Sequence, residues 1–367
     1  MNSLLVRAAG AVLGAELLDA VELGGSRRSS VLRCRRTETG DSVIVKAYRP
    51  TQWGRDSFVC EAAGLAFAER AGISPRLLGA DPAVPLVVMT DLGIAPSVAD
   101  LLLTAGAAAS DPLLQWAAAC GRLAAWSAGP GRRLELARLR SAYDGSAELA
   151  DPARIGAAIL SVPNLIEQAG VAVPAALDSE IAGVAELLRD GRYRVFSPGD
   201  LCPDNNLVTA DGVRLIDYED AGFHSVFLDA AYWRMPFSSC WCVGRLPAGL
   251  AAALERTYRA AVGAAYPDLA ADEVWQPGVR RACAVWTLHT MSYLLDRALG
   301  EDRSMNPGVA WAPTARQLLR YRWETLGSWL SAAGELPVLA GVLRDLLTAT
   351  SHWRVPDLPA YPALPVR

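Results

Sequence analysis

The chain has 367 residues, of which 52% are hydrophobic and 20% are charged, and its formal net charge is −4. This composition is typical of a folded globular protein and excludes a disordered chain, and the weak negative charge argues against a nucleic-acid-binding surface. Two lobes or domains are expected at this length, and no apolar run approaches the ~20 residues that a transmembrane helix needs.

Seven cysteines, an odd number, are predicted to be reduced thiols of a cytoplasmic protein rather than a disulfide framework. Cys240 and Cys242 could be half of a metal site, but no second ligand pair stands at zinc-site spacing, so a structural role is favoured. Residues 1–14 predict an amphipathic first helix rather than a signal peptide, because Glu16 and Asp19 interrupt the apolar stretch.

The first quarter of the chain is predicted to form strands around one helix. Residues 43–45 are all β-branched, as is typical of a strand, and a turn is expected at residues 24–26. The helix is expected over residues 57–71, with Ser57 as its N-cap and Gly72 as its end. The predicted strands are residues 17–23, 30–36, 42–48 and 86–89.

The remainder of the chain is predicted to be mainly helical, starting with the alanine- and leucine-rich residues 95–190. The next expected elements are strands 193–196, 206–209 and 213–216, then helices 250–265, 279–299, 315–333 and 336–350. The tail, residues 355–367, holds four prolines and is expected to lie extended on the surface. The pattern therefore predicts an α+β fold with a small β-rich lobe over residues 1–92 and a large helical lobe over residues 93–367.

Lys46 is the only lysine among the 35 basic residues, and the other 34 are arginines. A chain that uses arginine almost everywhere is expected to keep a lysine where a compact ammonium is needed, for instance between phosphates and a carboxylate. The alternative is an ordinary surface lysine near the end of a strand.

The strongest candidate for chemistry is the segment of residues 196–220, which holds Asp200, Asn205 and Asp217. Phosphoryl transfer from ATP needs a carboxylate that aligns the attacking hydroxyl. It also needs an amide oxygen and a second carboxylate that hold magnesium. Asp200 and Asn205 are five positions apart on one predicted loop, and Asp217 comes directly after a predicted strand. The alternative is that these residues only shape turns.

These residues resemble the catalytic loop and the metal-binding motif of the aminoglycoside phosphotransferase and choline kinase-like family, which has the protein-kinase-like bilobal fold. The resemblance covers roughly residues 17–235. It departs at Pro198, where the family commonly has histidine, and the turn at residues 24–26 is a poor glycine-rich loop.

The resemblance implies an ATP- and Mg2+-dependent enzyme. It implies that Asp200 is catalytic, that Asn205 and Asp217 bind the metal, and that Lys46 binds phosphates while paired with Glu61. The other residues expected to contact the nucleotide are Gly25, Ser26, Met89, Thr90, Leu92 and Leu207.

Other polar residues carry less specific expectations. Asp229 is expected to stabilise the catalytic loop from a buried position. Glu219 and Asp220 could bind a cationic acceptor or be solvated loop charges, and His289 is interpreted as a satisfied core histidine. Most of the eleven tryptophans are expected to fill helix interfaces, with one or two left to line an acceptor pocket.

The favoured function is a phosphotransferase that moves the γ-phosphate of ATP to a hydroxyl of a small molecule, such as an aminoglycoside or other antibiotic, a sugar or an amino alcohol. Neither nucleic acid nor membrane is expected as a partner. One alternative is a kinase of peptide serine or threonine in natural-product maturation, which would need an open groove. The other is a nucleotide-binding pseudokinase scaffold, which the presence of Lys46, Asp200, Asn205 and Asp217 disfavours.

Overall fold

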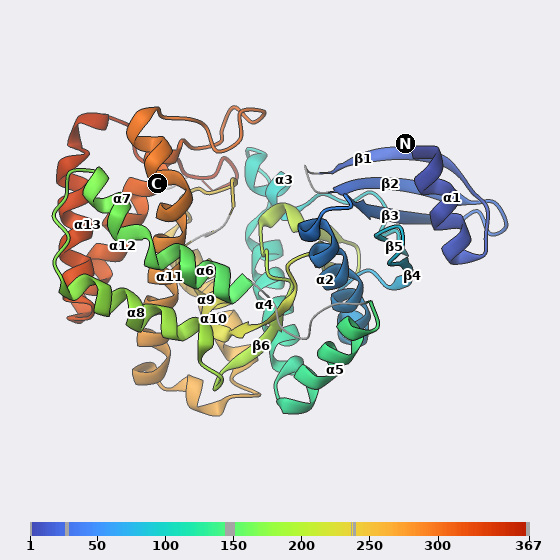
Figure 1. The fold of residues 1–367 in the computed structure, drawn as a ribbon, viewed down its shortest axis with the longest axis horizontal. Helices are drawn as coiled ribbons and strands as arrows, with labels where there is room; N and C mark the ends of the chain where they lie inside the picture. The colour runs from blue at the N-terminus through green and yellow to red at the C-terminus, as the bar shows by residue number, and fades with distance from the viewer. Residues whose placement is uncertain (1, 26–28, 144–150, 236, 238–239, 365–367) are drawn as a thin grey trace.

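A computed structural model describes residues 2–25, 29–143, 151–235, 237 and 240–364, with residues 151 and 152 described through their backbone. Its N-terminal part contains a five-stranded antiparallel sheet, and most of the remaining chain is helical (Figure 1). The predicted α+β fold class with a kinase-like arrangement is therefore confirmed.

The sheet has the strand order β1-β2-β3-β5-β4. Its strands are β1 (Leu17–Gly25), β2 (Ser29–Arg36), β3 (Ser42–Tyr48), β4 (Leu77–Asp81) and β5 (Leu86–Thr90). The four predicted strands are all present. β4 was not predicted, because every one of its residues is only half-buried and the segment shows no alternation of polar and apolar side chains.

One helix covers each face of the sheet. Val43, Val45 and Ala47 of β3 belong to the core under α1 (Asn2–Leu13), which is the predicted N-terminal helix. Because successive side chains of a strand point to opposite faces, Lys46 lies on the other face, toward α2 (Gln52–Ala68). The sheet thus places its one lysine on the side that faces the rest of the molecule.

The start of α2 differs from the prediction. Thr51 is its N-cap, since the Thr51 side chain accepts a hydrogen bond from the Gly54 amide, and Ser57 is buried inside the helix. The short helix η1 (Glu69–Ala71) then ends at Gly72, which adopts a φ of 67° as the predicted stop. Threonine and serine have similar preferences for the N-cap position, so the local sequence did not separate the two.

Besides its helices, the remaining chain contains two two-stranded antiparallel sheets, β6–β9 and β7–β8. The elements before the second of these sheets are α3 (Val98–Leu103), α4 (Ser110–Ser127), α5 (Pro130–Ser141), α6 (Asp151–Leu160), α7 (Val162–Gln168), α8 (Ala176–Arg189), β6 (Arg194–Ser197) and η2 (Pro203–Asn205). The later elements are β7 (Asn206–Thr209), β8 (Gly212–Leu215), β9 (Gly222–Ser225), α9 (Val226–Arg234), α10 (Ala248–Val262), η3 (Pro267–Ala270), α11 (Asp272–Gly300), α12 (Ala315–Ala333), α13 (Pro337–Ala349) and η4 (Ser351–Trp353). β9 and α9 were not predicted.

The C-terminal tail is not the surface strand that its prolines suggested. Leu358 and Tyr361 are buried, and the Tyr361 ring stacks on Trp311 at 5.1 Å between ring centroids. The Tyr361 hydroxyl also donates to the Cys242 carbonyl and accepts from the Gly244 amide. The prediction was wrong because two apolar side chains anchor the tail, whereas proline content constrains only the backbone; residues 365–367 lie outside the described part.

Across the described residues, none of the helices combines the length and the apolar character that crossing a bilayer requires.

Candidate active site

Lys46 is surrounded by three carboxylates. Its Nζ lies 2.9 Å from Glu61 Oε2, 2.7 Å from Asp217 Oδ1 and 3.2 Å from Glu219 Oε2. Lys46, Glu61 and Glu219 are buried, and Asp217 is partly open to solvent. The expected pair of Lys46 and Glu61 is therefore formed, within a larger cluster.

The cluster sets the charges of its members. Burial alone would lower the pKa of Lys46, but the nearby carboxylates, Glu61 first among them, raise it above its usual value. Burial raises the pKa of Glu61 to about 7, although Lys46 opposes that shift. Lys46 is thus held as a cation, and its ammonium keeps the pKa of Glu61 from rising further.

Glu61 also joins α2 to the segment after β8. Its Oε2 accepts hydrogen bonds from the Tyr48 hydroxyl at 3.1 Å and from the Tyr218 amide at 2.9 Å. One oxygen of Glu61 consequently holds α2, β3 and the segment after β8 together.

The loop that carries Asp200 is bonded to the two candidate metal ligands. The Cys202 amide donates to Asp200 Oδ1 at 3.1 Å, and the Asn205 Nδ2 donates to the Asp200 carbonyl at 3.3 Å. The Ile216 amide donates to the Asn205 carbonyl at 2.9 Å, which brings the next residue, Asp217, beside Asn205. Asp217 has a φ of 66°, a conformation that aspartate tolerates better than most residues.

The oxygens of this pair fit a hard divalent cation. Neither Asp217 Oδ2 nor Asn205 Oδ1 has a hydrogen-bond partner within the described residues. Carboxylate and amide oxygens are the ligands that Mg2+ takes in proteins. The donor set is therefore suitable for the metal that the sequence predicted.

Gly199, the residue after Pro198, lets the loop pass close to the chain after β8. Gly199 has a φ of 90°, and a Cβ atom there would lie 2.2 Å from the Asp220 carbonyl oxygen. The loop is also held by Asp229, which is buried and accepts from the Ser197 hydroxyl at 3.0 Å. His224 Nε2 lies 2.7 Å from the same Asp229 oxygen. The buried structural position expected for Asp229 is observed.

A cavity of about 860 Å3 lies between the sheet and this loop. We call it the nucleotide cavity because the residues that the sequence predicted to contact the nucleotide line it. All the predicted site residues that the structure describes line it, and Ser26 lies outside the described residues. They are Gly25, Lys46, Glu61, Met89, Thr90, Leu92, Asp200, Asn205, Leu207 and Asp217.

Asp91, directly after β5, is fixed to the sheet by contacts that were not predicted. Its carboxylate accepts from Arg33 Nε at 2.6 Å and from the Ser42 hydroxyl at 2.6 Å, and these bonds lower the pKa of Asp91 against the effect of its burial. The backbone of Thr90 and Leu92 is thereby held rigidly at the edge of the nucleotide cavity.

Asp200 also lines a second cavity, of about 510 Å3. It shares Asp200 and Asp220 with the nucleotide cavity. Its remaining walls are mostly aromatic and apolar and include Trp53, Ile155, Leu228, Trp286, His289 and Tyr293.

His289 is not the satisfied core histidine that was expected. It is partly exposed on the wall of the second cavity, and its ring nitrogens have no hydrogen-bond partner among the residues described. Burial, together with the Arg322 cation, lowers the pKa of His289 to about 4, so the imidazole is neutral at pH 7. Sequence could not reveal this, since the helix around it is apolar on either side.

Glu219 and Asp220 have different surroundings despite their adjacency. Glu219 is buried against Lys46, so it is not a solvated loop charge. Asp220 lines both cavities. The position of Glu219 two residues after Asp217 was the only signal that could have identified it as a third partner of Lys46.

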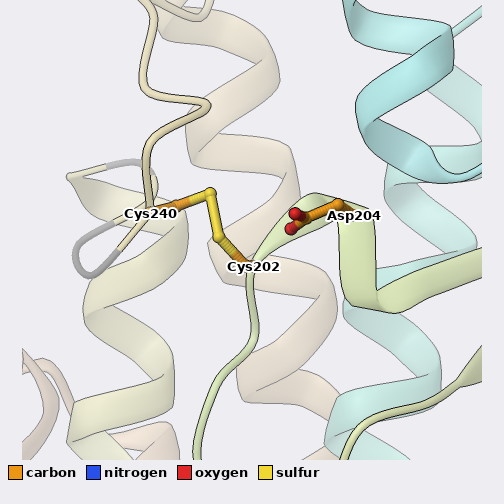
Figure 2. Close-up of side chains that lie close together, drawn as sticks. All are labelled: Cys202, Asp204 and Cys240. Atoms are coloured by element: carbon orange, nitrogen blue, oxygen red, sulfur yellow. A yellow bond between two sulfur atoms is a disulfide. The ribbon is translucent and has the colours of Figure 1, made fainter. Parts of the chain in front are cut away.

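The expectation of reduced cysteines is contradicted by a disulfide between Cys202 and Cys240 (Figure 2). The bond ties the loop after Asp200 to the chain after α9, while Cys242 is a buried free thiol. Composition could not predict it, because these cysteines are 38 positions apart and only the tertiary fold brings them together.

Asp204 lies beside the disulfide (Figure 2). Burial raises its pKa, and its Oδ2 accepts from Trp241 Nε1 at 2.9 Å. With both sulfur atoms bonded to each other, Cys202 and Cys240 offer no thiolate to a metal, in agreement with the structural role predicted for Cys240.

The fold is similar to solved kinase structures of low sequence identity. Choline kinase LicA from Streptococcus pneumoniae has 14% identity and a TM-score of 0.53, over 90% of this chain and 99% of that chain. A putative fructosamine-3-kinase from Thermobifida fusca has 19% identity and a TM-score of 0.50, over 90% of this chain and 99% of that chain. Amicoumacin kinase hAmiN in complex with AMP-PNP, Ca2+ and Ami has 13% identity and a TM-score of 0.50, over 89% of this chain and 93% of that chain.

No curated protein matches the chain in sequence. The model of the phosphotransferase enzyme family, however, matches residues 23–271, which is more than half of the chain and contains the entire Lys46 cluster and the Asp200 loop. The resemblance stated from the sequence is confirmed by this match. The chain therefore belongs to the phosphotransferase enzyme family and is a kinase.

Proposed function

We propose that this kinase transfers the γ-phosphate of ATP from the nucleotide cavity to a hydroxyl held in the second cavity, with Asp200 between them. The observation that carries this proposal is that Asp200 lines both cavities. A carboxylate at such a junction can reach a bound phosphate donor from one side and an acceptor from the other.

In the proposed step, the acceptor oxygen attacks the γ-phosphorus, and the bond between that phosphorus and the ADP oxygen breaks. The Asp200 carboxylate aligns the hydroxyl and takes its proton. Asp200 is suited to this role because the Cys202 amide, by donating to Oδ1, fixes the orientation of the carboxylate.

Lys46 is proposed to contact the α- and β-phosphates. Its ammonium is already oriented by Glu61, so little reorganisation is needed when the nucleotide binds. The adenine is proposed to lie against the backbone of residues 90–92, which Asp91 immobilises through Arg33 and Ser42.

Asn205 and Asp217 are proposed to hold Mg2+ through the two oxygens that lack protein partners within the described chain. The metal, when bound, would neutralise charge on the phosphates. The nucleotide and divalent cation present in the hAmiN complex support this assignment.

We also propose that residues 1–92 form the nucleotide-binding lobe, that residues 93–367 form the acceptor lobe, and that the protein works in the cytoplasm, where ATP is made.

The test is a transfer assay with γ-labelled ATP, Mg2+ and a panel of hydroxyl acceptors, run with the wild type, Asp200→Asn and the exposed control Asp111→Asn. Loss of a proton acceptor costs roughly 10²–10⁴-fold in rate. We expect Asp200→Asn to lose that much turnover at unchanged ATP affinity, and Asp111→Asn to behave as the wild type. Equal turnover of Asp200→Asn and the wild type would refute the role of Asp200.

A further inference from the structure

The size of the second cavity is informative about the acceptor. Its volume of about 510 Å3 is about 17 times the ~30 Å3 that one water occupies in the liquid. Pockets of roughly 300–1,000 Å3 are those that enclose drug-sized ligands. A small amino alcohol would leave most of this space unfilled.

Few charged residues line the second cavity. Among the described residues its lining carboxylates are Asp200 and Asp220, both shared with the nucleotide cavity, and its lining guanidinium is that of Arg154. An acceptor with several ammonium groups would find no further carboxylate among the described lining residues. Burying those cations unpaired is costly.

One face of α11 supplies a wall of the second cavity. Trp286, His289 and Tyr293 are spaced at three and four positions, so they lie along the same side of the helix. Their rings contact one another, with centroids 6.0 Å apart for Trp286 and His289 and 5.4 Å apart for His289 and Tyr293. This wall presents a continuous aromatic surface to whatever enters.

The polar groups of the wall are limited to neutral ones. Trp286 Nε1 already donates to the Leu228 carbonyl at 3.0 Å, so Trp286 offers only its ring surface. His289 retains both ring nitrogens for a ligand, one as a donor and one as an acceptor. An uncharged carbonyl, ether or hydroxyl on the acceptor matches that imidazole.

We propose that the acceptor is an uncharged, ring-containing and mainly apolar alcohol of drug size, which packs against Trp286 and Tyr293 and hydrogen-bonds His289. This inference rests on the proposed function. The proposal excludes polycationic aminosugars, small amino alcohols and simple sugars as the preferred acceptor.

The first experiment compares acceptors that differ in the molecular skeleton that carries the hydroxyl. The full chain is incubated with γ-labelled ATP and Mg2+, and with choline, kanamycin, glucose, 2-naphthaleneethanol or estradiol. We expect kcat/KM for the two ring-containing apolar alcohols to exceed that for the other three at least tenfold.

The second experiment removes parts of the wall. Tyr293 is 39% exposed, so Tyr293→Ala is expected to fold, and His289→Leu removes the hydrogen-bonding groups while keeping an apolar side chain. Each should raise the KM of the best acceptor about tenfold and leave the KM of Mg–ATP unchanged. Arg297→Ala, an exposed change on the same helix, is the matched control and should alter neither value.

Efficient phosphorylation of choline, kanamycin or glucose in preference to the ring-containing alcohols would overturn the inference and leave the proposed function standing. So would an acceptor KM that neither Tyr293→Ala nor His289→Leu changes. Binding of Mg–ATP without transfer to any of the five acceptors would count against the proposed function and the inference together.

Discussion

Lys46 Nζ and Asp217 Oδ1 lie 2.7 Å apart although 171 positions separate them in the chain. Lys46 belongs to β3, and Asp217 comes after β8, so this ion pair joins the sheet to the loops of the helical part. Glu61 on α2 shares the same ammonium. The phosphate-binding candidate and the metal-binding candidate are therefore positioned by each other.

Replacing Lys46 tests how far the cluster depends on one ammonium. Removal of one partner from a buried ion pair costs roughly 3–5 kcal/mol, because the remaining charges are left uncompensated. We expect Lys46→Met to lower the free energy of unfolding by about that amount and to abolish turnover. Urea unfolding, monitored by tryptophan fluorescence, measures the free energy of unfolding.

Lys46→Arg serves as the companion variant, since it keeps the charge but brings a planar group into a space that holds a compact one. It should recover part of the stability and little of the turnover. The exposed pair of Arg35 and Asp19 provides the control, because Arg35→Ala is expected to cost no more than about 1 kcal/mol. A Lys46→Arg enzyme with wild-type turnover would contradict the assigned contact with phosphates.

His289 predicts a specific loss of stability in mild acid. Burial and Arg322 lower its pKa in the folded chain to about 4, below the value near 6.5 of an unfolded chain. Between these values the unfolded chain binds the proton and the folded chain does not. The free energy of unfolding therefore falls as the pH falls, by about 2 kcal/mol between pH 6.5 and pH 5.

The comparison of the wild type with His289→Asn isolates this effect. The variant should lose about 2 kcal/mol less over the same pH interval, as measured by urea midpoints at each pH. The exposed His352→Asn should behave as the wild type does. Parallel pH profiles for the wild type and His289→Asn would show that His289 does not titrate as described.

The bond between Cys202 and Cys240 predicts sensitivity to reduction. The cysteines are 38 positions apart, and a crosslink over that length restricts the unfolded chain by about 4 kcal/mol in the chain-entropy description. We expect dithiothreitol to lower the free energy of unfolding by up to that amount. The double variant Cys202→Ser, Cys240→Ser should have the lower stability with or without dithiothreitol, and an unchanged urea midpoint of the reduced wild type would argue against the bond.

Much of the fold could be predicted from local pattern. β3 is predicted from its β-branched residues, and α11 and α12 are predicted from the long helical period of their apolar residues. Each pattern arises because one side of the element must be buried. β4 and β9 escaped prediction because β4 contains Gly79 and Asp81 and β9 begins with Gly222, residue types that are depleted in strands. Short strands are defined by their partners rather than by their own residues.

The candidate site was predictable to the extent that its residues stand at fixed spacing along one loop or at the end of a recognisable strand. Asp200, Asn205 and Asp217 are of this kind. The contacts of Glu219 with Lys46 and of Asp91 with Arg33 are not, because they depend on how distant strands and loops pack. The exposure of His289 to a cavity likewise depends on which face of α11 is left uncovered by its neighbours.

The positive φ of Asp217 restricts what evolution can place at that position. Asparagine adopts this backbone conformation as readily as aspartate does, whereas most other side chains are strained there. An aspartate codon becomes an asparagine codon by a single nucleotide change. If Asp217 holds the metal as proposed, a descendant of this gene can lose phosphate transfer in one mutational step and keep the shape of the loop, so that selection for a well-folded chain would not remove it.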